Sequence, residues 1–90
     1  MSKEQTQQQT ATLEVTQREH SLILFNDHEN TFDHVIDMLC TICNHDELQA
    51  EQCAWITHYK GKCVVLEGSY NDLEPKASLM GDAGLTVHIH

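Results

Sequence analysis

The stretch Leu22-Ile23-Leu24-Phe25-Asn26-Asp27-His28-Glu29-Asn30 contains the change of pattern that decides the fold. Its first four residues form a short, continuous apolar run, which is typical of a buried strand. Its last five residues are mostly polar residues that favour turns, so they predict a loop directly after the strand. The sequence therefore places a cluster of polar side chains at a strand-to-helix junction, where side chains are often not needed to pack the core.

Two helices are predicted after this loop. Apolar residues recur at helical spacing over residues 31–43, so we expect a first helix there, with Asn30 as its N-cap. The run Asn44-His45-Asp46-Glu47 resembles a capping box that begins at Asn44, and it predicts a second helix that ends at about residues 58–59. Gly61 is suited to the left-handed conformation that terminates a helix.

The remainder of the chain predicts a strand, a helix and a strand. We expect strands over residues 63–66 and 85–89, and between them a short helix capped by Asn71 or Asp72. Pro75 is expected in the first turn of that helix, where proline is tolerated. The order β-α-α-β-α-β predicts an α+β fold, a compact sandwich in which three helices cover one face of a three-stranded sheet.

The first residues differ in composition from the rest of the chain. Residues 1–19 are rich in Gln and Thr, and Leu13 and Val15 are their only sizeable apolar groups. Such a segment buries too little surface to offset its ordering entropy, so we expect a flexible N-terminal tail. We expect residues 20–90 to form a single folded domain.

The chain is small and acidic, with 90 residues and a formal net charge of -9. This charge argues against nucleic acid and anionic membranes as partners. The sequence has no apolar stretch of membrane-spanning length and no signal-peptide pattern, so we expect a cytoplasmic protein. A domain of this size has little room for a walled catalytic cleft, which favours a binding module over an enzyme, and we expect a monomer.

Motifs for catalysis and metal binding are weak. The chain contains none of the nucleophile-elbow, phosphate-loop or zinc-protease signatures. Cys40 and Cys43 have the spacing of a metal-binding pair, which leaves a small metal- or redox-responsive protein as an alternative. However, this pair falls in the last turn of a predicted helix and has no second pair to complete a site. We therefore interpret the four cysteines as free thiols and expect no metal and no cofactor.

The loop after the first strand carries the most specific chemistry. Asn26 and Asp27 offer oxygen acceptors suited to an ammonium group, and His58 would complete the set if the end of the second helix lies against the loop. A cationic group beside an apolar wall is the chemistry of a peptide N-terminus. The alternative is an Asx turn that satisfies local backbone groups, with His58 as a helix C-cap, and residue chemistry alone favours this alternative.

Three segments together resemble the ClpS family, adaptors of the ATP-dependent Clp protease: residues 22–27, the helix Val35-Ile36-Asp37-Met38-Leu39, and His58-Tyr59-Lys60-Gly61-Lys62. Family members bind destabilising N-terminal residues (N-degrons with a bulky hydrophobic first residue) and deliver the substrates to the AAA+ unfoldase of the protease. The resemblance implies a non-enzymatic adaptor. It implies that the substrate α-amino group is bound by Asn26, Asp27 and His58, and that the pocket for the first side chain is lined by Phe32, Val35, Ala54 and Leu85. It also implies that Lys76 docks the N-terminal domain of the unfoldase.

The sequence departs from the family pattern at the candidate site. His28 stands where the family usually has a second Asp, and Phe32 and Ala54 hold positions often occupied by Met. These departures bear on which first residues are preferred. Because His58 accepts a hydrogen bond only when neutral, binding is expected to weaken as the pH falls and the ring gains a proton. A regulator of the unfoldase that does not read N-termini is the other alternative.

Overall fold

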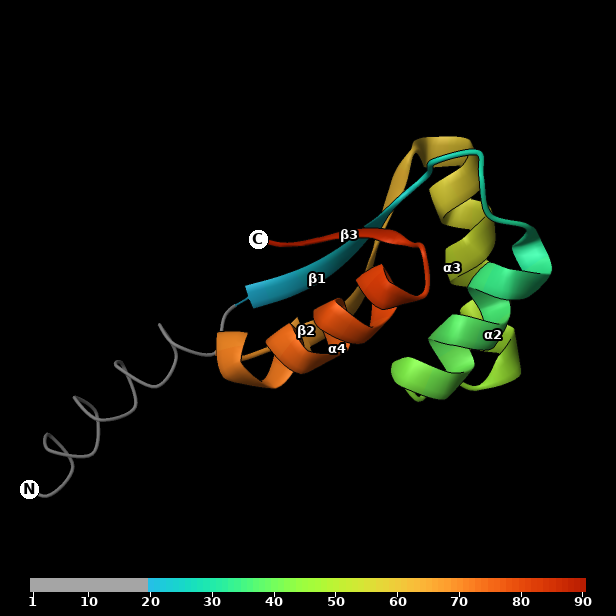
Figure 1. Cartoon of the computed structure of the whole chain (residues 1–90). Coiled ribbons are helices and arrows are strands. Elements are labelled where there is room, and N and C mark those ends of the chain that lie inside the picture. Colours follow the sequence, from blue (N-terminus) through green and yellow to red (C-terminus); the bar gives the residue numbers. More distant parts are fainter. Residues whose placement is uncertain (1–19) are drawn as a thin grey trace, which may run out of the picture.

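Strand β1 (His20–Phe25) is the central strand of a three-stranded antiparallel sheet in the computed structural model, which describes residues 20–90 (Figure 1). It pairs with β2 (Lys62–Gly68) on one side and with β3 (Thr86–Ile89) on the other. Leu22 and Leu24 are fully buried, because alternate residues of a strand point to the same face. The predicted buried strand is confirmed, whereas the predicted tail over residues 1–19 lies outside the described residues.

Three helices complete the fold: α2 (Phe32–Ile42), α3 (Glu47–Lys60) and α4 (Tyr70–Asp82). Figure 1 shows α4 lying along the sheet, with α2 and α3 side by side as a helix pair beyond one end of it. Helix α4 packs against all three strands, α3 packs against β2, and α2 packs against both other helices. The predicted β-α-α-β-α-β order and the α+β class are confirmed. None of these helices, within the part of the chain described, is long and apolar enough to cross a membrane.

The core lies between the sheet and the three helices. Its fully buried large side chains are Leu22 and Leu24 from β1, Leu39 from α2 and Met80 from α4. Burying these side chains together stabilises the packing of α2 and α4 in the core by removing apolar area from water.

The first two helices use different N-caps from those predicted. The hydroxyl of Thr31, not the side chain of Asn30, accepts the backbone N–H three residues ahead in α2. Likewise the carboxylate of Asp46, and not Asn44, caps α3. Asn44 instead adopts a left-handed conformation with φ of 58° directly after α2, a role that asparagine tolerates better than most residues.

The third predicted helix is longer than expected and begins earlier. Ser69 is the N-cap of α4, in place of the predicted Asn71 or Asp72, and the helix spans 13 residues. Pro75 consequently lies in the helix interior and not in the first turn. Because proline has no N–H, the carbonyl of Asn71 lacks its usual intrahelical donor.

A β-bulge ties the α2–α3 connection to the sheet. Leu22 pairs with Leu66 and Ile23 with Val64, so Val65 is the extra residue of β2. The carbonyl of Val65 accepts a hydrogen bond of 2.7 Å from Nε2 of His45, which must therefore carry the proton. His45 is buried, and this bond fixes the start of α3 against β2.

Candidate functional site

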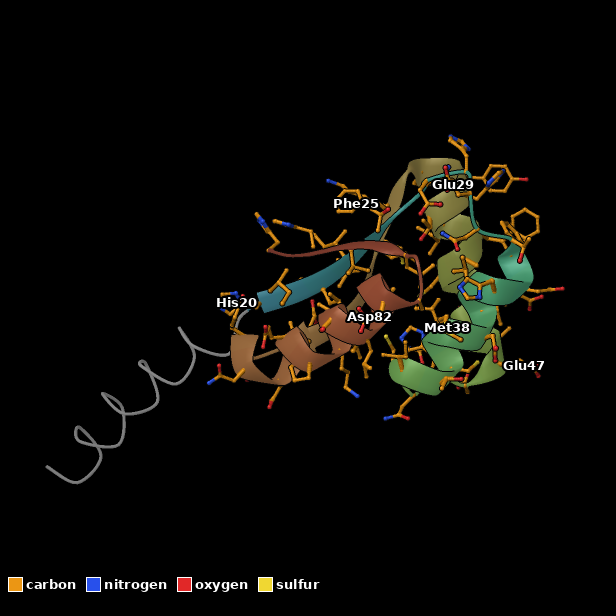
Figure 2. The ribbon with its side chains drawn as sticks, viewed as in Figure 1. His20, Phe25, Glu29, Met38, Glu47 and Asp82 are labelled. Atoms are coloured by element: carbon orange, nitrogen blue, oxygen red, sulfur yellow. The ribbon has the colours of Figure 1, made fainter. Side chains whose placement is uncertain are left out.

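The loop after β1 is held against the C-terminal end of α3. The backbone N–H of Asn26 donates to the carbonyl of Gly61 at 3.0 Å. Gly61 has the predicted left-handed conformation, with φ of 93°, and ends α3. His58 lies one helical turn before this residue, so the loop and the imidazole belong to the same end of the molecule. Figure 2 shows the labelled Phe25 and Glu29 on either side of this turn of the chain, near that end of α3.

Asp27 organises the loop. Its carboxylate accepts hydrogen bonds from the N–H of Glu29 at 3.0 Å, from Nδ2 of Asn30 at 3.1 and 2.9 Å, and from the hydroxyl of Thr86 at 3.1 Å. Partial burial opposes ionisation, but these hydrogen bonds outweigh it and hold the pKa of Asp27 below its usual range. The hydrogen bond from the N–H of Glu29 forms the Asx turn expected from the sequence. The Asp27 carboxylate therefore accepts at least one hydrogen bond that serves the local structure of the loop.

Asn30 connects the loop to the far end of the chain. Its Nδ2 group also donates to the carbonyl of Gly84 at 3.0 Å, in the connection between α4 and β3. Beside it, Nε2 of His34 lies 2.9 Å from the carbonyl of Ala83 in the same connection. The sequence predicts Asn30 as a helix cap and does not indicate this role, because no local pattern signals a partner 54 residues away.

A cavity of about 220 Å³ opens between this loop and the helix pair. The residues that the sequence predicts to bind the α-amino group or to line the hydrophobic pocket come from the loop after β1, from α2, from α3 and from the segment before β3. The structure brings all seven of them together in the lining of this cavity: Asn26, Asp27, His58, Phe32, Val35, Ala54 and Leu85.

Two polar groups on the rim have no hydrogen-bond partner among residues 20–90. Within residues 20–90, neither the side-chain amide of Asn26 nor the imidazole of His58 hydrogen-bonds to another protein group. The His58 ring is exposed and packs edge-on against Phe32, with ring centroids 5.4 Å apart. Both groups can therefore exchange water for a ligand without breaking a protein hydrogen bond.

The inner walls of the cavity are apolar. Ala54 and Leu85 are buried, and Val35 is half-buried on the facing side of α2. Thr57 also lines the cavity, although no sequence pattern indicates it, and its hydroxyl donates to the carbonyl of Cys53 at 2.8 Å. The chemistry of the cavity is thus a polar mouth over an apolar interior, which suits a ligand with a polar head and a hydrophobic side chain.

Lys76 lies elsewhere in the fold. Its ammonium group donates to the carbonyl of Ile42 at 3.0 Å and so joins the middle of α4 to the end of α2. The side chain is half-buried and does not line the cavity. A contact with a partner at this position would accordingly involve a lysine whose position is already fixed by the fold.

All four cysteines are free thiols. Cys43 and Cys53 are buried, and burial raises the pKa of these thiols to about 11 and about 12 respectively. Cys43 Sγ contacts Met80 Sδ at 3.6 Å, which makes it part of the core. Across residues 20–90, no group of three or more His, Cys, Asp or Glu side chains is placed to hold a metal ion.

The family model of ClpS, the ATP-dependent Clp protease adaptor protein, matches residues 15–88. Among solved structures, Agrobacterium tumefaciens ClpS2 bound to L-phenylalaninamide is similar with a TM-score of 0.70 and 18% sequence identity, over 82% of this chain and 96% of that chain. This similarity shows a shared fold. The comparison with curated proteins found no match. Because the family model spans most of its 90 residues, this chain belongs to the ClpS family of Clp protease adaptor proteins.

Proposed function

We propose that this chain binds protein N-termini that begin with a bulky hydrophobic residue and delivers those proteins to the AAA+ unfoldase of a Clp protease. The observation that carries the proposal is the single cavity that joins the polar rim of Asn26, Asp27 and His58 to an apolar interior. Such a site matches the first residue of a protein, which has an ammonium group and a side chain on the same carbon.

The polar rim fits the ammonium group. Removing an ammonium from water is costly unless acceptors replace the lost hydrogen bonds. The Asn26 amide oxygen and a neutral His58 nitrogen are available for this purpose, and the ionised Asp27 adds a negative charge beside them. Because three neighbours already occupy the Asp27 carboxylate, we propose that it acts mainly through its charge or through a bridging water.

The volume of the cavity fits an aromatic side chain. An apolar cavity of about 150 Å³ in another protein holds a benzene molecule, and this cavity measures about 220 Å³. Burying a large apolar side chain contributes about 1.5–3 kcal/mol, which is enough to reject small or charged first residues. L-phenylalaninamide, bound by the structurally similar Agrobacterium protein, has the same combination of free amine and aromatic side chain.

Delivery to the protease is proposed for a different surface. Lys76 of α4 is the proposed contact with the N-terminal domain of the unfoldase, and it lies outside the cavity lining. In this proposal the substrate and the unfoldase therefore bind separate surfaces of the adaptor. The domain contributes no catalytic step in this proposal, since the hydrolysis of ATP and of peptide bonds belongs to the protease.

Peptide binding tests the proposal directly. Peptides that begin with Phe, Leu or Trp and carry a dye at the C-terminus should bind with a free amine, and acetylation of the amine should abolish binding. His58→Ala and Asp27→Ala should each weaken binding of the free-amine peptide. Equal binding of acetylated and free peptides would overturn the proposal and favour an unfoldase regulator that does not read N-termini.

A further inference from the structure

An exposed aromatic surface lies beside the mouth of the cavity. The half-buried Phe32 at the start of α2 and the exposed Trp55 and Tyr59 on α3 form this surface, which we call the aromatic ledge. Trp55 is 44% exposed and Tyr59 is 70% exposed. The buried face of α3 is formed by other residues, among them Cys53 and Thr57, so the ledge is not needed to attach α3 to the core. Contiguous exposed apolar side chains of this size indicate a contact surface.

The ledge is ordered by its own contacts. The Trp55 and Tyr59 rings are stacked, with centroids 5.2 Å apart and an angle of 4° between planes. Phe32 meets Trp55 edge-on at 4.7 Å. Rings held in this way lose little freedom when a ligand covers them, so the ledge is prepared for binding before a partner arrives.

The ledge is continuous with the cavity. Phe32 belongs to both, since it lines the cavity and packs against Trp55. His58, on the polar rim, packs against Phe32, and its ring centroid also lies 4.8 Å from that of Tyr59. A polypeptide whose first residue occupies the cavity, with its amine at His58, can therefore leave the site across the ledge.

The surface beyond the ledge is acidic. A groove between α2 and α3 is lined by the carboxylates Asp33, Glu47 and Glu51 together with Ile36 and Leu48. Glu51 lies one turn before Trp55 on the same face of α3. Figure 2 shows the labelled Glu47 at the end of α3 remote from the loop that carries Glu29. Electron-rich rings followed by carboxylates complement a chain with cationic side chains.

We propose that the aromatic ledge and the α2–α3 groove bind the residues that follow the first residue of a substrate, and that they select Lys or Arg there. The inference rests on the proposed function, because it needs the first residue in the cavity. The path from His58 to Glu47 covers 11 helical steps, about 16 Å, which about five extended residues span. The selected positions are therefore residues 2 to about 6 of the substrate.

Paired readouts on one series of peptides test this inference. The peptides begin with Phe, have a free amine and carry Lys, Gln or Glu at positions 2–4, with a dye at the C-terminus. Anisotropy of the dye gives the affinity. Trp55 is the only tryptophan of the chain, so its fluorescence reports directly whether the ledge is covered. We expect the Lys peptide to bind at least about threefold more tightly than the Gln peptide, and the Glu peptide to bind most weakly.

Two variants locate the preference, and a third serves as a control. Glu51→Gln removes one groove charge on the helix surface, and Trp55→Ala removes the centre of the ledge. Each should bring the Lys and Gln peptides closer in affinity. Leu79→Ala trims an apolar side chain on α4 that is 54% exposed, and it should leave the ratio of the affinities for the Lys and Gln peptides unchanged. Added salt should reduce the ratio in the wild type.

The outcomes separate this inference from the proposed function. Equal affinity for the three peptides, or no change in Trp55 fluorescence on binding, would overturn the inference. A Lys preference that persists in both Glu51→Gln and Trp55→Ala would also overturn it. In these cases the proposed function still stands if acetylation abolishes binding. Loss of the amine requirement would instead remove the proposed function, whichever peptide binds best.

Discussion

Asn30 donates hydrogen bonds from Nδ2 to both carboxylate oxygens of Asp27, at 3.1 and 2.9 Å, and to the carbonyl of Gly84 at 3.0 Å. One side-chain amide thus joins the loop after β1 to the connection before β3. The same carboxylate accepts a hydrogen bond from the hydroxyl of Thr86, the first residue of β3. The polar rim of the cavity is consequently held by contacts between segments that are far apart in the sequence.

Replacement of Asn30 should loosen this rim. Asn30→Ala removes the donor that serves Asp27 and Gly84, so we expect the free energy of unfolding to fall by about 1–3 kcal/mol. Binding of a Phe-first peptide should weaken as well, because the loop that carries Asn26 is then less ordered. Urea unfolding and dye anisotropy measure the two effects. Thr86→Val, which removes one hydrogen bond to Asp27, should have a smaller effect on both, and wild-type values for Asn30→Ala would contradict this account.

Asp27 should contribute stability that depends on pH. The hydrogen bonds in the loop lower its folded pKa, so its contribution is fully present above the unfolded pKa of about 3.9. It is lost as the pH falls through the folded pKa. Asp27→Asn should therefore be less stable than the wild type near neutral pH, and the difference should shrink as the pH falls through the lowered folded pKa of Asp27. Urea unfolding across this range is the measurement, and a difference that does not change with pH would refute the assignment.

The side chain at position 54 should set the size of the first residue that binds. Ala54 is buried in the cavity wall, so Ala54→Met extends a long side chain into the space. We expect affinity for Phe-first and Trp-first peptides to fall at least about tenfold, since the ring loses most of its burial. Leu-first peptides should lose less. Ala54→Ser keeps the space and serves as the matched variant, and an unchanged Phe-to-Leu ratio in Ala54→Met would count against this pocket.

Lys76 should act in the fold as well as in docking. Lys76→Met keeps an apolar stem but leaves the Ile42 carbonyl without its donor, so we expect a loss of about 1 kcal/mol in unfolding free energy. Binding to the N-terminal domain of the unfoldase should weaken, whereas peptide binding should not change, because Lys76 lies outside the cavity. Calorimetric titration with the N-terminal domain of the unfoldase measures the first affinity, and anisotropy of a labelled peptide measures the second. Reduced peptide affinity would show that the two surfaces are not separate.

The thiols should divide into two classes. Burial raises the pKa of Cys43 to about 11 and that of Cys53 to about 12, so little thiolate forms at mild pH. Cys40 and Cys63 are half-buried and should react first with a thiol reagent in the native state. Mass mapping of the labelled residues at successive times distinguishes the classes. Rapid labelling of Cys43 or Cys53 in the folded protein would contradict the described burial.

The order of the elements could be predicted because it depends on local patterns. The apolar run that becomes β1 and the glycine that ends α3 carry their signals within a few residues. The helix caps were less predictable, because neighbouring residues compete for the same role. Asn30 is a suitable cap by type, but its amide is used by Asp27 and Gly84, which leaves the cap to Thr31.

The sequence by itself therefore determined the element order, the α+β class and the identity of seven of the residues that line the cavity, since the last followed from a family resemblance carried by short segments. Only the tertiary structure decided how they meet. The Asn26–Gly61 hydrogen bond brings the loop to α3, and Asn30 and Thr86 hold Asp27 in place. The aromatic ledge beside the cavity arises from contacts between α2 and α3. Such relationships join distant segments, and their energies depend on packing that no local pattern encodes.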